Sequence, residues 1–315
     1  MSQPLFAGID VSKSQLDIAI NQGDELLEFC SVPHTEEGIS TLMQKFRNAM
    51  PQLIVVERSG GLERSLVALL AEAGLPVVAN NPRQIRDFAK AMGILAKTDK
   101  IDAKTMAHFA ATVKPPQRPI KDAERQQLSD LVARRRQLVN MLTQEKNRLS
   151  RSVGPARADI EHHITYLKDR LNKTNKNIEQ MIANSPIYQE TVEILVTFPG
   201  LGRVTSAALV ADCPELGSLN RRKIGTLTGT APLNDDSGTR TGQRYIRGGR
   251  KTVRSHLYMA TISAIRCNYK IKGFYQRLIA AGKKPKVAIT ACMHKIITIL
   301  NAMVKHRKPW QTDAV

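Results

Sequence analysis

The chain has 315 residues, enough for two or three domains rather than one. Its net charge of +19 is unevenly distributed: residues 1–115 sum to −1, residues 116–185 to +6 and residues 186–315 to +14. A near-neutral first part and a basic remainder predict metal chemistry in one region and phosphate binding in another, rather than a charge that serves solubility alone. Aromatic residues make up only 4% of the chain, which argues against base stacking as the main mode of nucleic-acid binding.

Cysteine usage and hydropathy exclude several classes of protein. The four cysteines are far apart and form no Cys-x-x-Cys pair, so neither a zinc site nor a disulfide framework is expected, and we expect reduced, half-buried thiols. No apolar stretch reaches roughly 18 residues, and the N-terminus does not resemble a signal peptide. The sequence therefore predicts a cytoplasmic protein without a membrane partner.

The first third of the chain predicts a sheet flanked by helices. Apolar runs indicate three strands, with a hairpin turn at residues 21–24; these are residues 5–10, 16–20 and 26–31. Alternating helices and strands follow: a helix at 38–50, a strand at 53–57, a helix at 62–72, a strand at 76–79 and a helix opened by Asn81-Pro82. This order is that of a ribonuclease-H-like nuclease fold. The predicted fold class is therefore α/β in this part and α in the rest.

Four carboxylates in this region are placed to converge. Asp10 and Glu57 each end a buried apolar run, at the two places where the predicted fold requires an acid. Asp99 and Asp102 lie three residues apart on a probable helix. Converging carboxylates bind hard divalent cations, so the four acids are predicted to be catalytic and to hold one or two magnesium ions. The basic remainder of the chain indicates a phosphodiester substrate.

The middle of the chain predicts a helical stalk. After a proline-rich break at residues 115–119, apolar residues recur at a 3–4 spacing: leucine over 128–149, and isoleucine, leucine and a final methionine over 160–181. Arg135, Glu145 and Thr174 depart from the pattern. Heptad spacing on two consecutive segments is typical of a coiled coil, with arms of about 40 Å. The arms either fold back on each other or pair with another subunit, and a buried helical hairpin is the alternative.

The last part begins near Pro186 and contains a turn that resembles a helix-hairpin-helix motif. Residues 197–207 read Thr-Phe-Pro-Gly-Leu-Gly-Arg-Val-Thr-Ser-Ala, a pattern that directs backbone N–H groups and Arg203 toward a phosphate. An ordinary loop between helices is the alternative. Helices are expected over 252–266 and 285–305.

Residues 234–251 form a polar, glycine-rich stretch with many arginines. Arginine forks suit phosphate oxygens, and glycines let the backbone approach a polyanion. The predicted nucleic-acid contacts here are Arg240, Arg244, Arg247, Arg250, Lys251 and Arg254. The stretch also holds one candidate nucleophile, Ser237, although most serines beside glycine simply form turns.

Taken together and in order, these motifs resemble the insertion sequence 110 family of DEDD recombinases, which includes pilin-gene invertases. The motifs are Gly-Ile-Asp-Val-Ser-Lys at 8–13, Glu57 after its strand, Lys-Thr-Asp-x-x-Asp-Ala at 97–103, Phe-Pro-Gly-Leu-Gly at 198–202, Asp-Ser-Gly at 236–238 and Arg-Tyr-Ile-Arg-Gly-Gly-Arg at 244–250. The resemblance implies a RuvC-like domain at 1–115, a coiled coil at 116–185 and a C-terminal transposase domain at 186–315. It also implies that Ser237 is the catalytic nucleophile.

Further properties follow from the resemblance alone. Family members are guided by a structured bridge RNA that pairs with target and donor DNA, and they act in the prokaryotic cytoplasm as tetramers built from dimers. The acids of one subunit meet the serine of another, and a phosphoserine link preserves the phosphodiester energy for rejoining.

Two competing functions remain open on the residues alone. A metal-dependent hydrolytic nuclease of the junction-resolvase type would need the four acids but not the serine. A non-catalytic nucleic-acid-binding protein on an inactive nuclease scaffold would need neither. Covalent attachment of DNA to Ser237 would distinguish the recombinase from both of these alternatives.

Overall fold

The structure, a computed structural model, describes residues 3–23, 25–58, 60–117, 123–239, 241–242 and 244–311. The chain divides into two compact units, residues 1–120 and residues 121–315. Each unit has its own core, and each is described by itself.

The first unit is built on a five-stranded sheet with the order β3-β2-β1-β4-β5. Its strands are β1 (Leu5–Val11), β2 (Gln15–Gln22), β3 (Glu25–Pro33), β4 (Leu53–Glu57) and β5 (Val77–Asn80). Strands β1, β2 and β3 form an antiparallel meander, whereas β4 and β5 continue the sheet in parallel with β1. Element order and sheet match the sequence prediction, and this mixed sheet is consistent with a RuvC-like domain.

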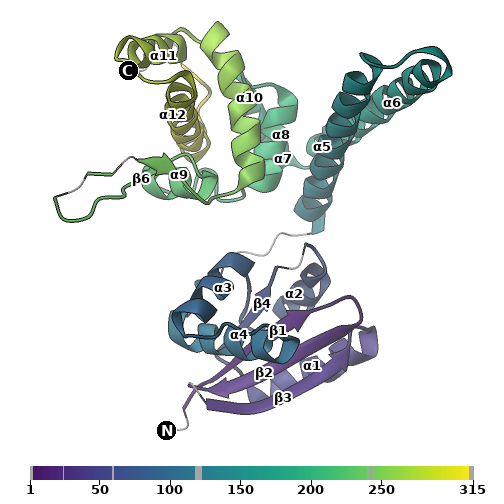
Figure 1. Cartoon of the computed structure of the whole chain (residues 1–315), viewed down its shortest axis with the longest axis vertical. Coiled ribbons are helices and arrows are strands. Elements are labelled where there is room, and N and C mark those ends of the chain that lie inside the picture. Colours follow the sequence, from purple (N-terminus) through teal and green to yellow (C-terminus); the bar gives the residue numbers. More distant parts are fainter. Residues whose placement is uncertain are drawn as a thin grey trace. The chain divides into compact units, whose positions relative to one another are not determined.

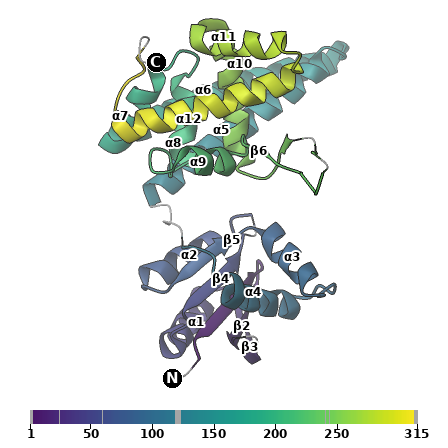
Figure 2. The same ribbon diagram turned by 90° about the vertical axis from the view of Figure 1, so that its left-hand side faces the viewer.

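Helices cover both faces of this sheet (Figure 2). The helices are α1 (Glu36–Ala49), α2 (Glu63–Glu72), α3 (Pro82–Ala91) and α4 (Asp99–Val113). Phe46 of α1 and Leu66 of α2 pack with Ile9 on one face, whereas Ile85 of α3 and Met106 of α4 pack on the other. The face under α3 and α4 is the one that carries the candidate acids.

The second unit begins with two long antiparallel helices, α5 (Ala123–Leu149) and α6 (Gly154–Asn184) (Figure 1). They pack along each other and bury Leu138 of α5 and Leu167 of α6. Arg135, which departs from the apolar pattern of α5, has a partner on α6: its Nε donates to Asn175 Oδ1 at 2.8 Å. The arms therefore fold back on each other within one chain, and pairing with another subunit stays a prediction.

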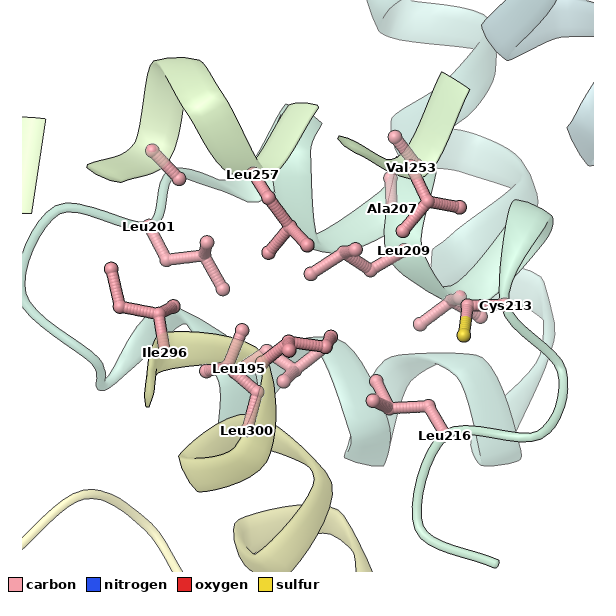
Figure 3. Close-up of a cluster of buried hydrophobic side chains, with 14 of the residues drawn as sticks. Leu195, Leu201, Ala207, Leu209, Cys213, Leu216, Val253, Leu257, Ile296 and Leu300 are labelled. Carbon is pink, nitrogen blue, oxygen red and sulfur yellow. The ribbon is translucent and has the colours of Figure 1, made fainter. Parts of the chain in front are cut away.

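The rest of the second unit is a helical domain with its own core (Figure 3). Its elements are α7 (Pro186–Val196), α8 (Arg203–Asp212), α9 (Arg221–Thr228), β6 (Pro232–Leu233), β7 (Tyr245–Ile246), α10 (Lys251–Cys267), α11 (Tyr269–Ala280) and α12 (Pro285–His306). Leu195, Leu209, Leu257 and Ile296 meet in the core from four different helices. Helices α10 and α12 agree with the expected ranges to within one residue.

Helix α12 alone, among the described residues, is long and apolar enough to cross a membrane by length and composition. Half of its most apolar window is buried inside the unit, where Ile296 and Leu300 pack in the core. His294 and Lys295 interrupt its run of apolar residues.

The four cysteines are free thiols. Cys213 and Cys292 are buried, Cys30 is half-buried and Cys267 is exposed. Burial raises the pKa of Cys213 to about 12 and that of Cys292 to about 11, so both are neutral, apolar core residues at neutral pH.

Candidate active site

Asp10 and Glu57 lie at the ends of two adjacent parallel strands. Strands β1 and β4 are paired up to the residues immediately before these acids. Side chains alternate along a strand, and Phe6 on β1 and Val55 on β4 both pack beneath α3 and α4. Because Asp10 and Glu57 follow at even spacing, they point to that same face.

Helix α4 brings the other two acids toward this face. Thr98 caps the helix, and its hydroxyl accepts a hydrogen bond from the Ile101 N–H at 3.2 Å. The cap starts the helix at Asp99, so Asp99 and Asp102 both lie in the first turn, where the helix dipole favours negative charge. Only 17% of the Asp102 side chain is exposed, whereas Asp99 is exposed.

Gly8 determines how closely α4 approaches the acid-bearing strand. A Cβ at Gly8 would lie 2.3 Å from the Ala103 carbonyl oxygen and 2.4 Å from the Ala107 backbone nitrogen. Both distances are too short for non-bonded atoms, so only glycine fits at this position. Helix α4 therefore rests directly on β1. This contact places the first turn of α4, with its two acids, beside the end of β1 where Asp10 lies.

Burial and the negative charges of neighbouring acids raise the pKa values of three of the four acids. Burial, followed by the charges of Asp102 and Asp99, raises the pKa of Asp10. Burial, followed by the charges of Asp10 and Asp102, raises the pKa of Glu57. Burial also raises the pKa of Asp102, although Lys97 opposes that shift. The like charges thus share one neighbourhood, as expected for acids that act together.

The chemistry of these donors fits a hard divalent cation. All are carboxylate oxygens, and a cation among them would offset the repulsion that raises their pKa values. Within the described part of the chain, no three Asp, Glu, His or Cys side chains are already grouped so that they could hold a metal ion. The backbone therefore brings the acids to one face of the sheet, but their side chains do not yet form a complete set of metal ligands.

A pocket of about 420 Å³ adjoins these acids. Glu57 and Asp102 line one part of it, and four basic side chains from α3 and the loop after it line another: Arg83, Arg86, Lys90 and Lys97. The Lys97 Nζ atom lies 3.9 Å from Asp102 Oδ2. The sequence analysis did not predict these four basic side chains as part of the site. The helical spacing of residues 83, 86 and 90 could have indicated that three of them share one face of α3. The pocket offers space for an anion beside the acids.

Asn80 is a further polar residue at this site that sequence reasoning missed. It ends β5 and pairs in register with Glu57, and it shares a face with Val78, which packs beneath α3 and α4. Asn80 is 9% exposed, and its Nδ2 atom has no hydrogen-bond partner among the described residues. A buried amide donor without a partner is costly, and a water molecule or a ligand that accepts from it would offset that cost.

Ser237 lies exposed in the long loop between β6 and β7, which extends away from the helices of the second unit (Figure 1). Tyr245 Oη donates to Asp235 Oδ2 at 2.9 Å, and the Gly242 N–H donates to Asp236 Oδ1 at 3.2 Å. These bonds hold the two sides of the loop together around the serine. The acids belong to the first unit and Ser237 to the second.

The predicted nucleic-acid contacts fall into two groups. The exposed ones are Arg203, Arg244, Arg247 and Lys251. Arg240 lies outside the described residues. Phosphate contact by the exposed side chains stays a prediction, and two other arginines of the same stretch bond to acceptors inside the unit.

Arg250 and Arg254 brace the base of the loop. Arg250 forms a two-pronged ion pair with Glu215, at 2.5 and 2.6 Å, and also donates to the Asp212 carbonyl at 2.8 Å. Arg254 donates to the Gly248 carbonyl at 2.6 Å. Both guanidinium groups therefore have protein acceptors, and direct contact of these two arginines with nucleic acid stays a prediction.

The turn between α7 and α8 has a structural reason for its first glycine. Gly200 has a φ of +101°, and a Cβ there would lie 2.6 Å from the backbone of Ala264 on α10. This turn thus packs closely against α10. Arg203 follows as the exposed first residue of α8. Phosphate binding by this turn stays a prediction.

Comparison with known proteins agrees with this arrangement. A family model of DEDD transposases, described as a transposase, matches residues 7–153 and so spans all four acids. A second, described as the transposase IS116/IS110/IS902 family, matches residues 192–276, which include Ser237 and the arginine-rich stretch. This chain belongs to the IS110 transposase family. Membership implies DNA recombination and DNA binding.

Two pilin gene-inverting proteins of Moraxella species match nearly the whole chain. The chain is 25% identical to a pilin gene-inverting protein of Moraxella bovis over 97% of both chains, and equally to that of Moraxella lacunata. It is 26% identical to an uncharacterized 44.8 kDa protein of insertion element IS116 from Streptomyces clavuligerus, over 48% of this chain and 37% of that one. The similarity to the inverting proteins thus includes both units.

Proposed function

We propose that this protein is a DNA recombinase that cleaves and rejoins strands through a phosphoserine intermediate on Ser237. The observation that carries the proposal is the gathering of Asp10, Glu57 and Asp102 at one face of the sheet. After burial, the charge of Asp102 raises the pKa of Asp10, and the charges of Asp10 and Asp102 raise the pKa of Glu57. Such a cluster suits phosphodiester chemistry. The names of the inverting relatives support DNA rearrangement as the outcome.

In the proposed step, the Ser237 oxygen attacks the scissile phosphorus. A new phosphorus–oxygen bond forms to serine, the bond to one sugar oxygen breaks, and that oxygen leaves as a hydroxyl after accepting a proton. The number of phosphoester bonds is unchanged, so the reverse attack by a different DNA hydroxyl rejoins strands without ATP. The exposure of Ser237 allows a bulky duplex to reach it.

The acids would hold one or two magnesium ions, and Asp99 would complete the set from the first turn of α4. When bound, magnesium supplies charge stabilisation for the transferred phosphate and favours loss of the serine proton. Arg83, Arg86 and Lys90 would hold the substrate's phosphates beside the acids, and Asn80 would donate to an oxygen nearby.

The remaining parts of the proposal concern partners. A noncoding bridge RNA is proposed as the guide, and a tetramer as the active assembly, both on the family resemblance and on the +14 charge of residues 186–315. Because acids and serine lie in different units of the chain, a site shared between subunits is compatible with their placement.

The decisive experiment follows covalent DNA attachment. The protein is expressed with a plasmid that carries its gene and the noncoding DNA on either side, and protein-linked DNA is recovered under denaturing conditions. We expect linkage to Ser237 in the natural protein and none in Ser237→Ala. Thr239→Ala, which removes a hydroxyl from the same exposed loop, is the matched control and should keep linkage.

Each outcome separates the competing functions. Strand cleavage by Ser237→Ala, with no DNA linked to the protein, would replace this proposal with a hydrolytic nuclease. Loss of cleavage in both Ser237→Ala and Asp10→Asn, with linkage only in the natural protein, supports the recombinase.

A further inference from the structure

The second unit contains a large pocket that lies apart from the serine-bearing loop. Its volume is about 1160 Å³, above the range of roughly 300–1,000 Å³ typical of small-molecule sites. Helices α11 and α12 and the segment that follows α12 line it. The volume favours an extended ligand over a compact metabolite.

Three aromatic side chains line this pocket in a chain that has few. They are Tyr269 and Phe274 of α11 and Trp310 of the C-terminal segment. Trp310 is the only tryptophan of the protein. Its backbone N–H donates to Thr197 Oγ1 at 2.8 Å, and its ring meets Phe198 edge-on with centroids 4.9 Å apart. The indole is therefore held in place while it remains part of the pocket lining.

Basic side chains lie over these rings. Lys270 Nζ is 5.5 Å from the Trp310 ring centroid and 6.0 Å from that of Tyr269. Lys295 Nζ is 4.7 Å from the Phe274 centroid. Attraction between a cation and a ring face fixes the position of each ammonium group. The aromatic faces and the positive charges thus occupy the same surface.

The charges of the pocket have one sign. Four lysines and arginines line it: Lys270, Arg277, Lys295 and Lys308. Among the described residues, the lining includes no aspartate or glutamate. Clustered cations repel one another, and a polyanion in the pocket would relieve that repulsion.

From this combination we infer that the pocket between α11, α12 and Trp310 binds an unpaired stretch of nucleic acid. Phosphates would contact the four basic side chains, and a base would stack on the ring of Tyr269 or Trp310. Aromatic platforms flanked by cations are the usual means of holding single strands. A second copy of the chain complements the pocket poorly, because residues 186–315 carry +14.

The inference goes beyond strand cleavage and does not depend on it. The pocket holds neither Ser237 nor the acids, so Ser237→Ala protein should bind a single strand as well as the natural protein does. Failure of the recombinase proposal would leave this site untouched.

The single tryptophan gives a direct test in the full-length protein. Twelve-nucleotide adenine homopolymers of RNA and of DNA are titrated while Trp310 emission is followed, and binding is measured in parallel by anisotropy of labelled oligonucleotide. Stacking quenches indole emission, so we expect saturable quenching by at least one single strand. A duplex of equal length, which presents no unstacked base, should bind elsewhere and leave the emission unchanged.

Variants of exposed residues give the matched comparison. Tyr269→Ala should raise the half-saturation concentration about tenfold, since the loss of one stacked base has an effect of this order. Lys308→Glu should weaken the titration by a similar factor. Lys173→Glu, an equal charge reversal on exposed helix α6, should leave it unchanged. Circular dichroism melts confirm that each variant is folded.

Three results would overturn the inference. One is anisotropy that reports a bound single strand while Trp310 emission stays constant. Another is equal quenching by polyglutamate, which would assign the pocket to an acidic peptide. The third is quenching that follows protein concentration alone, which would assign it to a second copy of the chain. The homopolymer that quenches at the lower concentration identifies RNA or DNA as the source.

Discussion

The acid-bearing face of the first unit and the serine-bearing loop of the second are built in opposite ways. The acids stand at the ends of central strands, and α4 is pressed against β1 at Gly8. Ser237 stands on an exposed loop that is held by bonds between its own two sides, such as that from Tyr245 to Asp235. A fixed acid face and a serine on a projecting loop suit the proposed reaction, in which the serine is delivered to the acids.

The largest expected effect tests whether delivery crosses between subunits. Asp10→Asn and Ser237→Ala should each lose strand cleavage by at least about 100-fold, because even residues that only support metal ligands cost 10–100-fold when changed. Mixing the two proteins should restore a fraction of the cleavage if one subunit supplies the acids and another the serine. Cleavage of plasmid DNA is measured on gels.

The control for that mixture is Glu72→Gln, which neutralises an exposed acid outside the site. It should cleave normally. A mixture that stays inactive, although mass measurement shows mixed oligomers, would place acids and serine in the same subunit.

The second prediction concerns the contact that fixes the acid face. Gly8→Ala should destabilise the first unit by about 1–3 kcal/mol, because the added methyl meets backbone atoms of α4 that yield only if the helix shifts. Denaturant unfolding measures this. Gly273→Ala, where an added Cβ meets nothing within 4 Å, is the matched control and should be neutral or slightly stabilising. Equal effects at both glycines would contradict the close approach.

Asn80 provides a third and smaller test of the acid face. If its buried Nδ2 donates to substrate, Asn80→Ala should lower cleavage about tenfold with little change in nucleic-acid binding. Asn81→Ala, which removes the neighbouring amide that caps α3, should affect stability instead. Unchanged cleavage by Asn80→Ala would leave its unpartnered amide without a functional explanation.

The fourth test separates the outward from the inward arginines of the second unit. Binding to duplex DNA should weaken with salt at about −0.9 log units per phosphate contact. Replacing Arg244 and Arg247 with Glu should reduce the magnitude of that slope by about 2. Arg250→Gln should leave the slope unchanged and lower the melting temperature, because it breaks the pair with Glu215. The reverse pattern would mean that Arg250, not the exposed pair, reaches DNA.

The smallest expected effect is on the pH dependence of stability. Since the pKa values of Asp10 and Glu57 are raised, the folded state binds their protons more tightly than the unfolded state. Their contribution to stability is complete below the ordinary carboxyl pKa of about 4 and is lost as the pH rises through the raised values. In chelator, the natural protein should therefore lose more stability between pH 4 and 7 than Asp10→Asn. Thermal melts of both proteins measure the difference, and added magnesium should diminish it.

The sequence by itself determined the elements and the position of the acids within them. Apolar runs and helical periodicity are local properties, so the five strands, their order and the ends occupied by Asp10 and Glu57 could be predicted. Thr98 and the acids that follow it likewise mark the start of a helix. The charge asymmetry between the two parts of the chain was also visible without a structure.

Only the tertiary structure decided what those elements contact. Arg250 and Arg247 are equivalent in the sequence pattern, but Glu215, which lies 35 residues away, engages Arg250 alone. The same heptad pattern permits pairing within a chain or between chains, and packing selected the hairpin of α5 with α6. The pocket around Trp310 is lined by α11, by α12 and by the segment that follows α12. No local sequence pattern predicts that these segments lie together. Periodicity reports which face of an element is buried, whereas the partner depends on packing between residues distant in the chain.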